Sequence, residues 1–124
     1  MGKLYNYITG NVIATFENGK VYMGDNTTEV IAKYRDNKIY IRKGVRYTKI
    51  GKYVDDLFIM EKDVTNKYAV IGNVRKNKIY YGININNSRG VCTFEGEAVG
   101  AACAALVSNI FKEYISDEKA LYIK

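Results

Sequence analysis

The chain has 124 residues, a length at which a single domain can bury a substantial hydrophobic core. It carries a net charge of +6, which suits an anionic partner, and it contains no histidine, proline or tryptophan. The absence of histidine excludes Ser-His and Cys-His catalysis and removes the commonest transition-metal ligand. We therefore predict one non-catalytic domain over residues 1–124, with no metal and no cofactor.

Location and redox state follow from three further features. The abundance of Ile, Asn, Lys and Tyr suggests an AT-rich bacterial genome. The start, MGKLYNYITG, lacks the apolar core of a signal peptide, and no apolar run approaches the roughly twenty residues of a membrane-spanning helix. These features predict a cytoplasmic protein without a transmembrane segment. In that compartment Cys92 and Cys103 are expected to be buried thiols, with a disulfide or a reactive thiol as the less favoured alternative.

An internal repeat occupies most of the chain before residue 82. Four segments align: VIATFENGKVYM (12–23), VIAKYRDNKIYI (30–41), KIGKYVDDLFIM (49–60) and VIGNVRKNKIYY (70–81). Each has a two-residue turn at the same place, and Asn18-Gly19 is the strongest short hairpin signal because type I′ turns need positive φ at both central residues. The corresponding turns are Asp36-Asn37, Asp55-Asp56 and Lys76-Asn77.

Two further strands complete the expected fold, one from Leu4 to Ile8 and one from Arg89 to Phe94. Residues 3–94 then hold about ten strands. The predicted fold class is mainly β, an antiparallel meander of repeated hairpins that is barrel-like or flower-like, with one C-terminal apolar helix packed in or against it.

Alternation along the strands sorts the side chains into two faces. The predicted inner face consists of Val12, Ala14, Phe16, Val21, Met23, Val30, Ala32, Tyr34, Ile39, Ile41, Gly51, Tyr53, Phe58, Met60, Val70, Gly72, Val74, Ile79 and Tyr81. The predicted outer face consists of Ile13, Thr15, Tyr22, Ile31, Lys33, Tyr40, Arg42, Ile50, Lys52, Ile59, Glu61, Ile71, Asn73 and Tyr80. The outer isoleucines at positions 13, 31, 50 and 71 would form an apolar row suited to self-association.

The helix is expected over residues 97–115, followed by a tail at 116–124. Between Ala98 and Val107 every residue is apolar or glycine, and an all-round apolar helix is normally buried. We expect its small residues to meet the small residue of each repeat, so that small side chains pack against small ones. Those repeat residues are Ala14, Ala32, Gly51 and Gly72.

The element VIAKYRDNKIY, with its echoes VIATFENGKVY and VIGNVRKNKIY, resembles the hairpin repeat of the bacterial 4-fold beta flower family. The likeness runs from Val12 to Val107, because GEAVGAACAALV is similar to the Gly/Ala-rich segment that follows the hairpins in that family. The resemblance implies a hairpin fold and lends no catalytic residues. The third repeat departs from the pattern at Asp55-Asp56 and at Ile59, which takes the place of a tyrosine.

A basic tract carries the functional hypotheses. Candidate residues for an anionic partner are Lys33, Arg35, Tyr40, Arg42, Arg46, Lys49 and Lys52. Cations beside exposed aromatic rings suit a single-stranded nucleic acid. The alternative is a solvated face whose lysines protect strand edges. We expect a non-catalytic scaffold or binding module, possible partners being a second copy of the chain or an anionic polymer. The carboxylate pair Asp55-Asp56 is interpreted as a turn.

Overall fold

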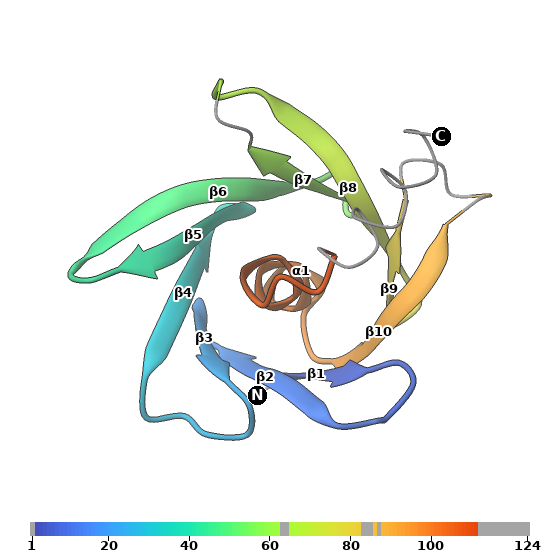
Figure 1. Cartoon of the computed structure of the whole chain (residues 1–124), viewed down its shortest axis with the longest axis horizontal. Helices are drawn as coiled ribbons and strands as arrows, with labels where there is room; N and C mark the ends of the chain where they lie inside the picture. Colours follow the sequence, from blue (N-terminus) through green and yellow to red (C-terminus); the bar gives the residue numbers. More distant parts are fainter. Residues whose placement is uncertain (1, 63–64, 83–85, 87, 112–124) are drawn as a thin grey trace, which may run out of the picture.

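The structure is a computed structural model, and it describes residues 2–62, 65–82, 86 and 88–111. Ten antiparallel strands follow one another around a closed barrel, and the last strand pairs with the first (Figure 1). This confirms the predicted β meander. The strands are β1 Gly2–Asn6, β2 Val12–Glu17, β3 Lys20–Met23, β4 Val30–Arg35, β5 Lys38–Lys43, β6 Arg46–Val54, β7 Phe58–Lys62, β8 Tyr68–Arg75, β9 Lys78–Tyr81 and β10 Arg89–Glu95.

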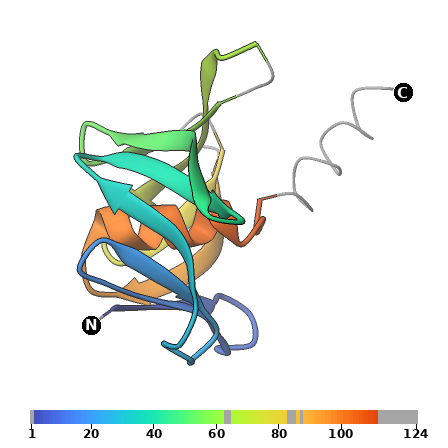
Figure 2. The ribbon, with the colours of Figure 1, turned by 90° about the vertical axis from the view of Figure 1, so that its left-hand side faces the viewer.

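The helix α1, Ala98–Val107, runs through the centre of the ring of strands (Figures 1 and 2). It is buried from Gly100 to Val107, as an apolar helix requires. The predicted helix was too long, because α1 ends at Val107 and residues 108–111 form turns. Residues 112–115 and the predicted tail at 116–124 lie outside the described residues.

The barrel contains a fifth hairpin that the repeat search missed. Its two strands come from opposite ends of the chain, since β10 pairs with β1 in the register that joins the strands of the other hairpins. Cys92 thereby takes the position that Ala14 and Ala32 hold in the first two repeats. The small-residue ring therefore has five members, at positions 14, 32, 51, 72 and 92.

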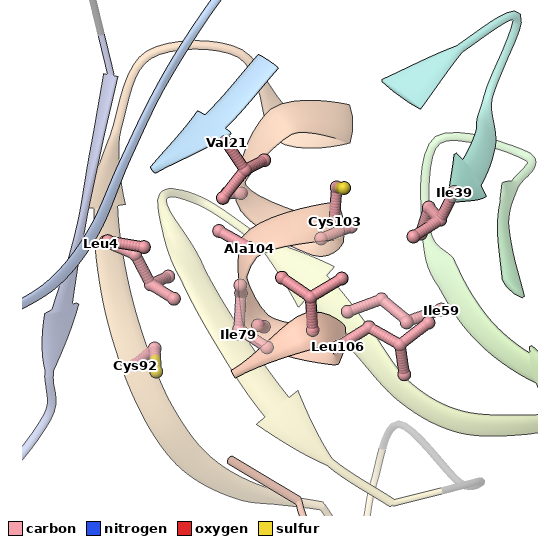
Figure 3. Packing of buried hydrophobic residues seen from close by; sticks show 14 of the residues in the cluster. Leu4, Val21, Ile39, Ile59, Ile79, Cys92, Cys103, Ala104 and Leu106 are labelled. Carbon is pink, nitrogen blue, oxygen red and sulfur yellow. The ribbon is translucent and has the colours of Figure 1, made fainter. Parts of the chain in front are cut away.

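The second strand of each hairpin, which is β1 in the fifth hairpin, directs one fully buried aliphatic side chain toward α1. These side chains are Leu4, Val21, Ile39, Ile59 and Ile79. Figure 3 shows them around the helix residues Cys103, Ala104 and Leu106. One equivalent residue from every hairpin thus builds a complete apolar layer around the helix.

Every junction between neighbouring hairpins contains a β-bulge at the same place. The register shifts leave one extra residue on the first strand of each hairpin, that is on β2, β4, β6, β8 and β10. These residues are Ile13, Ile31, Ile50, Ile71 and Val91. Ile71 and Val91 are buried, and the first three are partly buried and pack against the core. The predicted outer placement of this row was therefore wrong, because a bulge adds a residue that breaks the alternation of faces.

In the third hairpin, the predicted faces of strand β7 were wrong. Its turn has one residue more than the others, because Val54 pairs with Phe58 and not with Leu57. This extra residue reverses the faces of β7, so Ile59 is fully buried although it was predicted to lie outside. Phe58 and Met60, predicted to lie inside, are only partly buried. Met60, and not Ile59, occupies the tyrosine position of the repeat.

Both residues of all four predicted turn pairs have positive φ. The two-residue turns of the first, second and fourth hairpins are confirmed, whereas the third turn was predicted one residue too short. Exposure does not follow the predicted faces everywhere: Met23, predicted to lie inside, is half exposed, whereas Thr15 and Asn73, predicted to lie outside, are fully buried although they share the face of Tyr22 and Tyr80. Both buried polar side chains donate a hydrogen bond to a backbone carbonyl, Thr15 Oγ1 to Gly24 at 2.8 Å and Asn73 Nδ2 to Gly82 at 3.4 Å. Two equivalent positions of the repeat thus satisfy a buried polar group in the same way.

Glycines make close contact with large side chains, and this corrects the expected packing of small against small. A Cβ at Gly51 would lie 2.4 Å from Leu106 Cδ2, and one at Gly100 would lie 2.4 Å from Phe16 Cδ2. A Cβ at Gly72 would lie 3.0 Å from Phe111 Cε1. The missing side chains therefore provide room for bulky ones on the opposite element.

Candidate functional site

Strand register brings four of the seven predicted residues together on the outer face of β4, β5 and β6. Lys33 pairs with Tyr40, and Tyr40 pairs in turn with Lys49 on β6. Lys52 lies further along β6, where it faces Lys38. Adding Lys20 and Lys38, we call this surface the cationic face, and it comprises Lys20, Lys33, Lys38, Tyr40, Lys49 and Lys52.

The cationic face places like charges directly opposite each other. Lys20 pairs with Lys33 across β3 and β4, and Lys38 pairs with Lys52 across β5 and β6. Opposed like charges destabilise a sheet. Within the described residues, Lys33 and Lys52 form no ion pair that would offset this repulsion. An anion bound over the face would relieve it.

Tyrosine rings lie beneath the ammonium groups of this face. Lys33 Nζ lies 4.4 Å from the ring centroid of Tyr47, and Lys52 Nζ lies 4.5 Å from that of Tyr68. Lys49 Nζ approaches the Tyr68 ring as well, at 5.1 Å. The sequence interpretation missed Tyr47 and Tyr68, which lie outside the aligned repeat segments. It also missed Lys20, although this residue flanks its turn as Lys38 does.

The other three predicted residues are not members of the cationic face. Arg35 is highly exposed next to a hairpin turn, where it pairs with Lys38 across β4 and β5 and approaches Asp36 at 3.8 Å. Arg46 pairs with Lys43 beside the loop that joins β5 and β6. Arg42 donates from Nε to the carbonyl of Gly44 in that loop and from Nη1 to the carbonyl of Val30 at the start of β4.

The five hairpins provide an internal comparison for the lysines. Lys33 and Lys52 hold a position that is occupied by Thr15, Asn73 and Thr93 in the other hairpins. Because threonine and asparagine serve the same fold at this position, the fold does not require lysine there. The two lysines are therefore a property of one side of the barrel and not of the repeat.

The architecture is a small meander barrel filled by its own helix, with one cationic outer side. The described residues include no group of acids and cysteines that could hold a metal ion, and no helix among them is long and apolar enough to cross a membrane. No protein-family model, curated protein or solved structure matches the chain. The resemblance to the 4-fold beta flower family stays a prediction.

Both cysteines are free, buried thiols, as expected. Burial raises the pKa of the Cys92 thiol from 9.0 to about 12, and it also raises the pKa of the Cys103 thiol. A thiolate is the nucleophilic form, so these residues are poor candidates for chemistry at neutral pH.

The raised thiol pKa values predict a loss of stability in alkali. Above pH 9.0 the unfolded thiols ionise while the folded thiols stay protonated, so the free energy of unfolding falls as pH rises toward 12. Each thiol contributes a slope of about −1.4 kcal/mol per pH unit in that range. Cys92→Ala introduces the residue found at the equivalent positions 14 and 32. Because it removes one of the two thiols, the slope should become less steep by about 1.4 kcal/mol per pH unit. Urea unfolding at pH 7, 9 and 10 tests this, and equal slopes would contradict it.

Proposed function

We propose that this protein is a non-catalytic cytoplasmic binding module that takes single-stranded nucleic acid on its cationic face. The proposal rests mainly on the opposed lysine pairs Lys20–Lys33 and Lys38–Lys52. Two cross-strand repulsions on one side of the barrel are an arrangement that a polyanion stabilises. Tyr40 pairs with Lys33 and Lys49 within the cationic face, and its ring can stack with a base, which is accessible in a single strand.

The structural alternative for these lysines loses one of its two parts, the protection of strand edges. Lysines on edge strands prevent pairing with other chains, but the ten strands form a closed barrel that has no edge. Self-association through an outer row of isoleucines also loses its basis, because those side chains pack against the core. Binding of an anionic partner is therefore the function that the described surface supports best.

Binding is tested by fluorescence anisotropy of a labelled oligothymidylate at several NaCl concentrations. Contact with about four phosphates predicts a slope near −3 for the logarithm of the association constant against that of salt. In the Lys33→Thr/Lys52→Asn variant, which has the residues of the equivalent positions 15 and 73, the slope should become about 1.4 less steep. The affinity at low salt should fall by more than about tenfold.

The matched control removes two lysines from the opposite side of the barrel. Lys76→Asn/Lys78→Thr leaves the same net charge, and asparagine suits the positive φ of Lys76. This variant should bind the oligonucleotide nearly as well as the parent. Equal losses of affinity in both variants would mean that binding depends only on the net charge of the protein and not on the cationic face. Tighter binding of duplex than of single strands would exclude base stacking on tyrosine.

A further inference from the structure

A pocket of about 470 Å³ opens at the end of the barrel where α1 ends. Its volume lies within the range of small-molecule sites. Strands β3, β4 and β5 form its walls, with Val107 contributed by the helix. The lining residues include Glu29, Val30, Ile31, Ile41, Arg42 and Val107. Most of them are apolar, and the charged Glu29 and Arg42 are the exceptions.

On the other side of α1, the fourth hairpin has a position that corresponds to this pocket, and an aromatic ring fills it. There the Phe111 ring lies against Gly72, with its centroid 6.1 Å from that of Tyr81. Gly72 and Tyr81 are partners in the fourth hairpin, as Ala32 and Ile41 are in the second. In Figure 1, β4 and β9 lie on opposite sides of the helix. An aromatic ring is therefore a group that fits the space between α1 and a hairpin at this end of the barrel.

Arg42 provides the polar part of the pocket. Its Nε donates to the Gly44 carbonyl at 2.9 Å, and its Nη1 donates to the Val30 carbonyl at 3.1 Å. A guanidinium has five N–H donors, so these two bonds orient the group without exhausting it. Glu29 Oε1 lies 3.9 Å from Nη1 and is largely exposed. The guanidinium therefore already has a carboxylate within ion-pair distance.

We propose that this pocket binds a small aromatic carboxylate, with the ring against Ile41 and Val107 and the carboxylate on Arg42. Apolar walls with one oriented cation match the two halves of such a ligand. The ring takes the place that Phe111 has in the fourth hairpin, and the carboxylate replaces Glu29 beside the guanidinium. This site is separate from the cationic face and does not depend on the proposed function.

Methyl NMR of the full chain during titration with 4-phenylbutyrate tests the site. We expect saturable shifts of the methyl signals of Ile31, Ile41 and Val107. The neutral analogue 4-phenylbutanol should bind about tenfold more weakly, since it lacks the charge-assisted hydrogen bonds to Arg42. Equal affinity for the alcohol, or shifts centred on other residues, would overturn the proposal.

Variants separate the two halves of the site. Ile41→Tyr should abolish binding by filling the pocket, and the fold should accept it because Tyr81 holds the equivalent position. Arg42→Gln should weaken binding about tenfold, whereas Arg46→Gln, which removes a neighbouring charge outside the pocket, should not. Glu29→Gln should strengthen binding by removing the competing carboxylate. Full affinity in folded Ile41→Tyr would refute the site even if Arg42→Gln failed to fold.

Discussion

Replacing Gly51 by alanine is expected to lower the free energy of unfolding by about 2–3 kcal/mol or more. The added Cβ would lie 2.4 Å from Leu106 Cδ2 on the central helix and 2.4 Å from the Met60 carbonyl oxygen on β7. Leucine could change its rotamer, but a backbone carbonyl within a closed barrel cannot move without shifting its strand. Urea unfolding followed by circular dichroism measures the loss.

Gly90→Ala is the matched control for this substitution. A Cβ at Gly90 would meet its nearest neighbour, Tyr7 Cε2, at 3.5 Å, which is ordinary van der Waals contact. Both glycines lie in strands outside the positive-φ region, so the same chemical change differs only in the space around it. We expect Gly90→Ala to change stability by less than about 1 kcal/mol. Equal effects of the two substitutions would contradict the contact between α1 and the small-residue ring.

Local chemistry made the hairpins predictable. Asn18-Gly19 identifies a type I′ turn, and the same apolar spacing at three later positions extended that identification to weaker turn formers such as Lys76-Asn77. The fifth hairpin escaped because its strands are joined by closure of the barrel and not by a turn. Residues 91–95, VCTFE, do match IATFE at 13–17, but their partner strand β1 lies at the other end of the sequence.

The bulges explain why alternation assigned some faces wrongly. Each repeat has two consecutive apolar residues at the same place, Ile31-Ala32 for example, and both are buried at least in part. A period of two must place one member of such a pair outside. The pair itself is the available signal for a bulge, since a hairpin with one face in water has no reason to keep an isoleucine there in every repeat.

The candidate surface could be predicted only where the strand register is simple. Lys33 and Lys52 hold equivalent positions between the bulge and the turn on the first strand of their hairpins, so alternation alone predicted their shared face. Arg42 belongs to the same alternation, but its guanidinium donates to the carbonyls of Gly44 and Val30, and alternation along a strand does not predict these contacts. Tyr68 reaches Lys49 and Lys52 from a strand two places along the barrel, and no pattern local to the sequence predicts that contact.

Ile59→Ala is expected to cost about 2–5 kcal/mol of stability, because it removes a fully buried side chain from the layer around α1. Met60→Ala should cost less, since Met60 is only partly buried. The pair tests the three-residue turn directly: a two-residue turn at Asp55-Asp56 would bury Met60 and expose Ile59, and the larger loss would then belong to Met60→Ala. Thermal and urea unfolding of both variants decide between the registers. Since the extra residue Leu57 also accepts the Val74 N–H hydrogen bond at 2.8 Å, the register of β7 fixes that of its neighbour β8 as well.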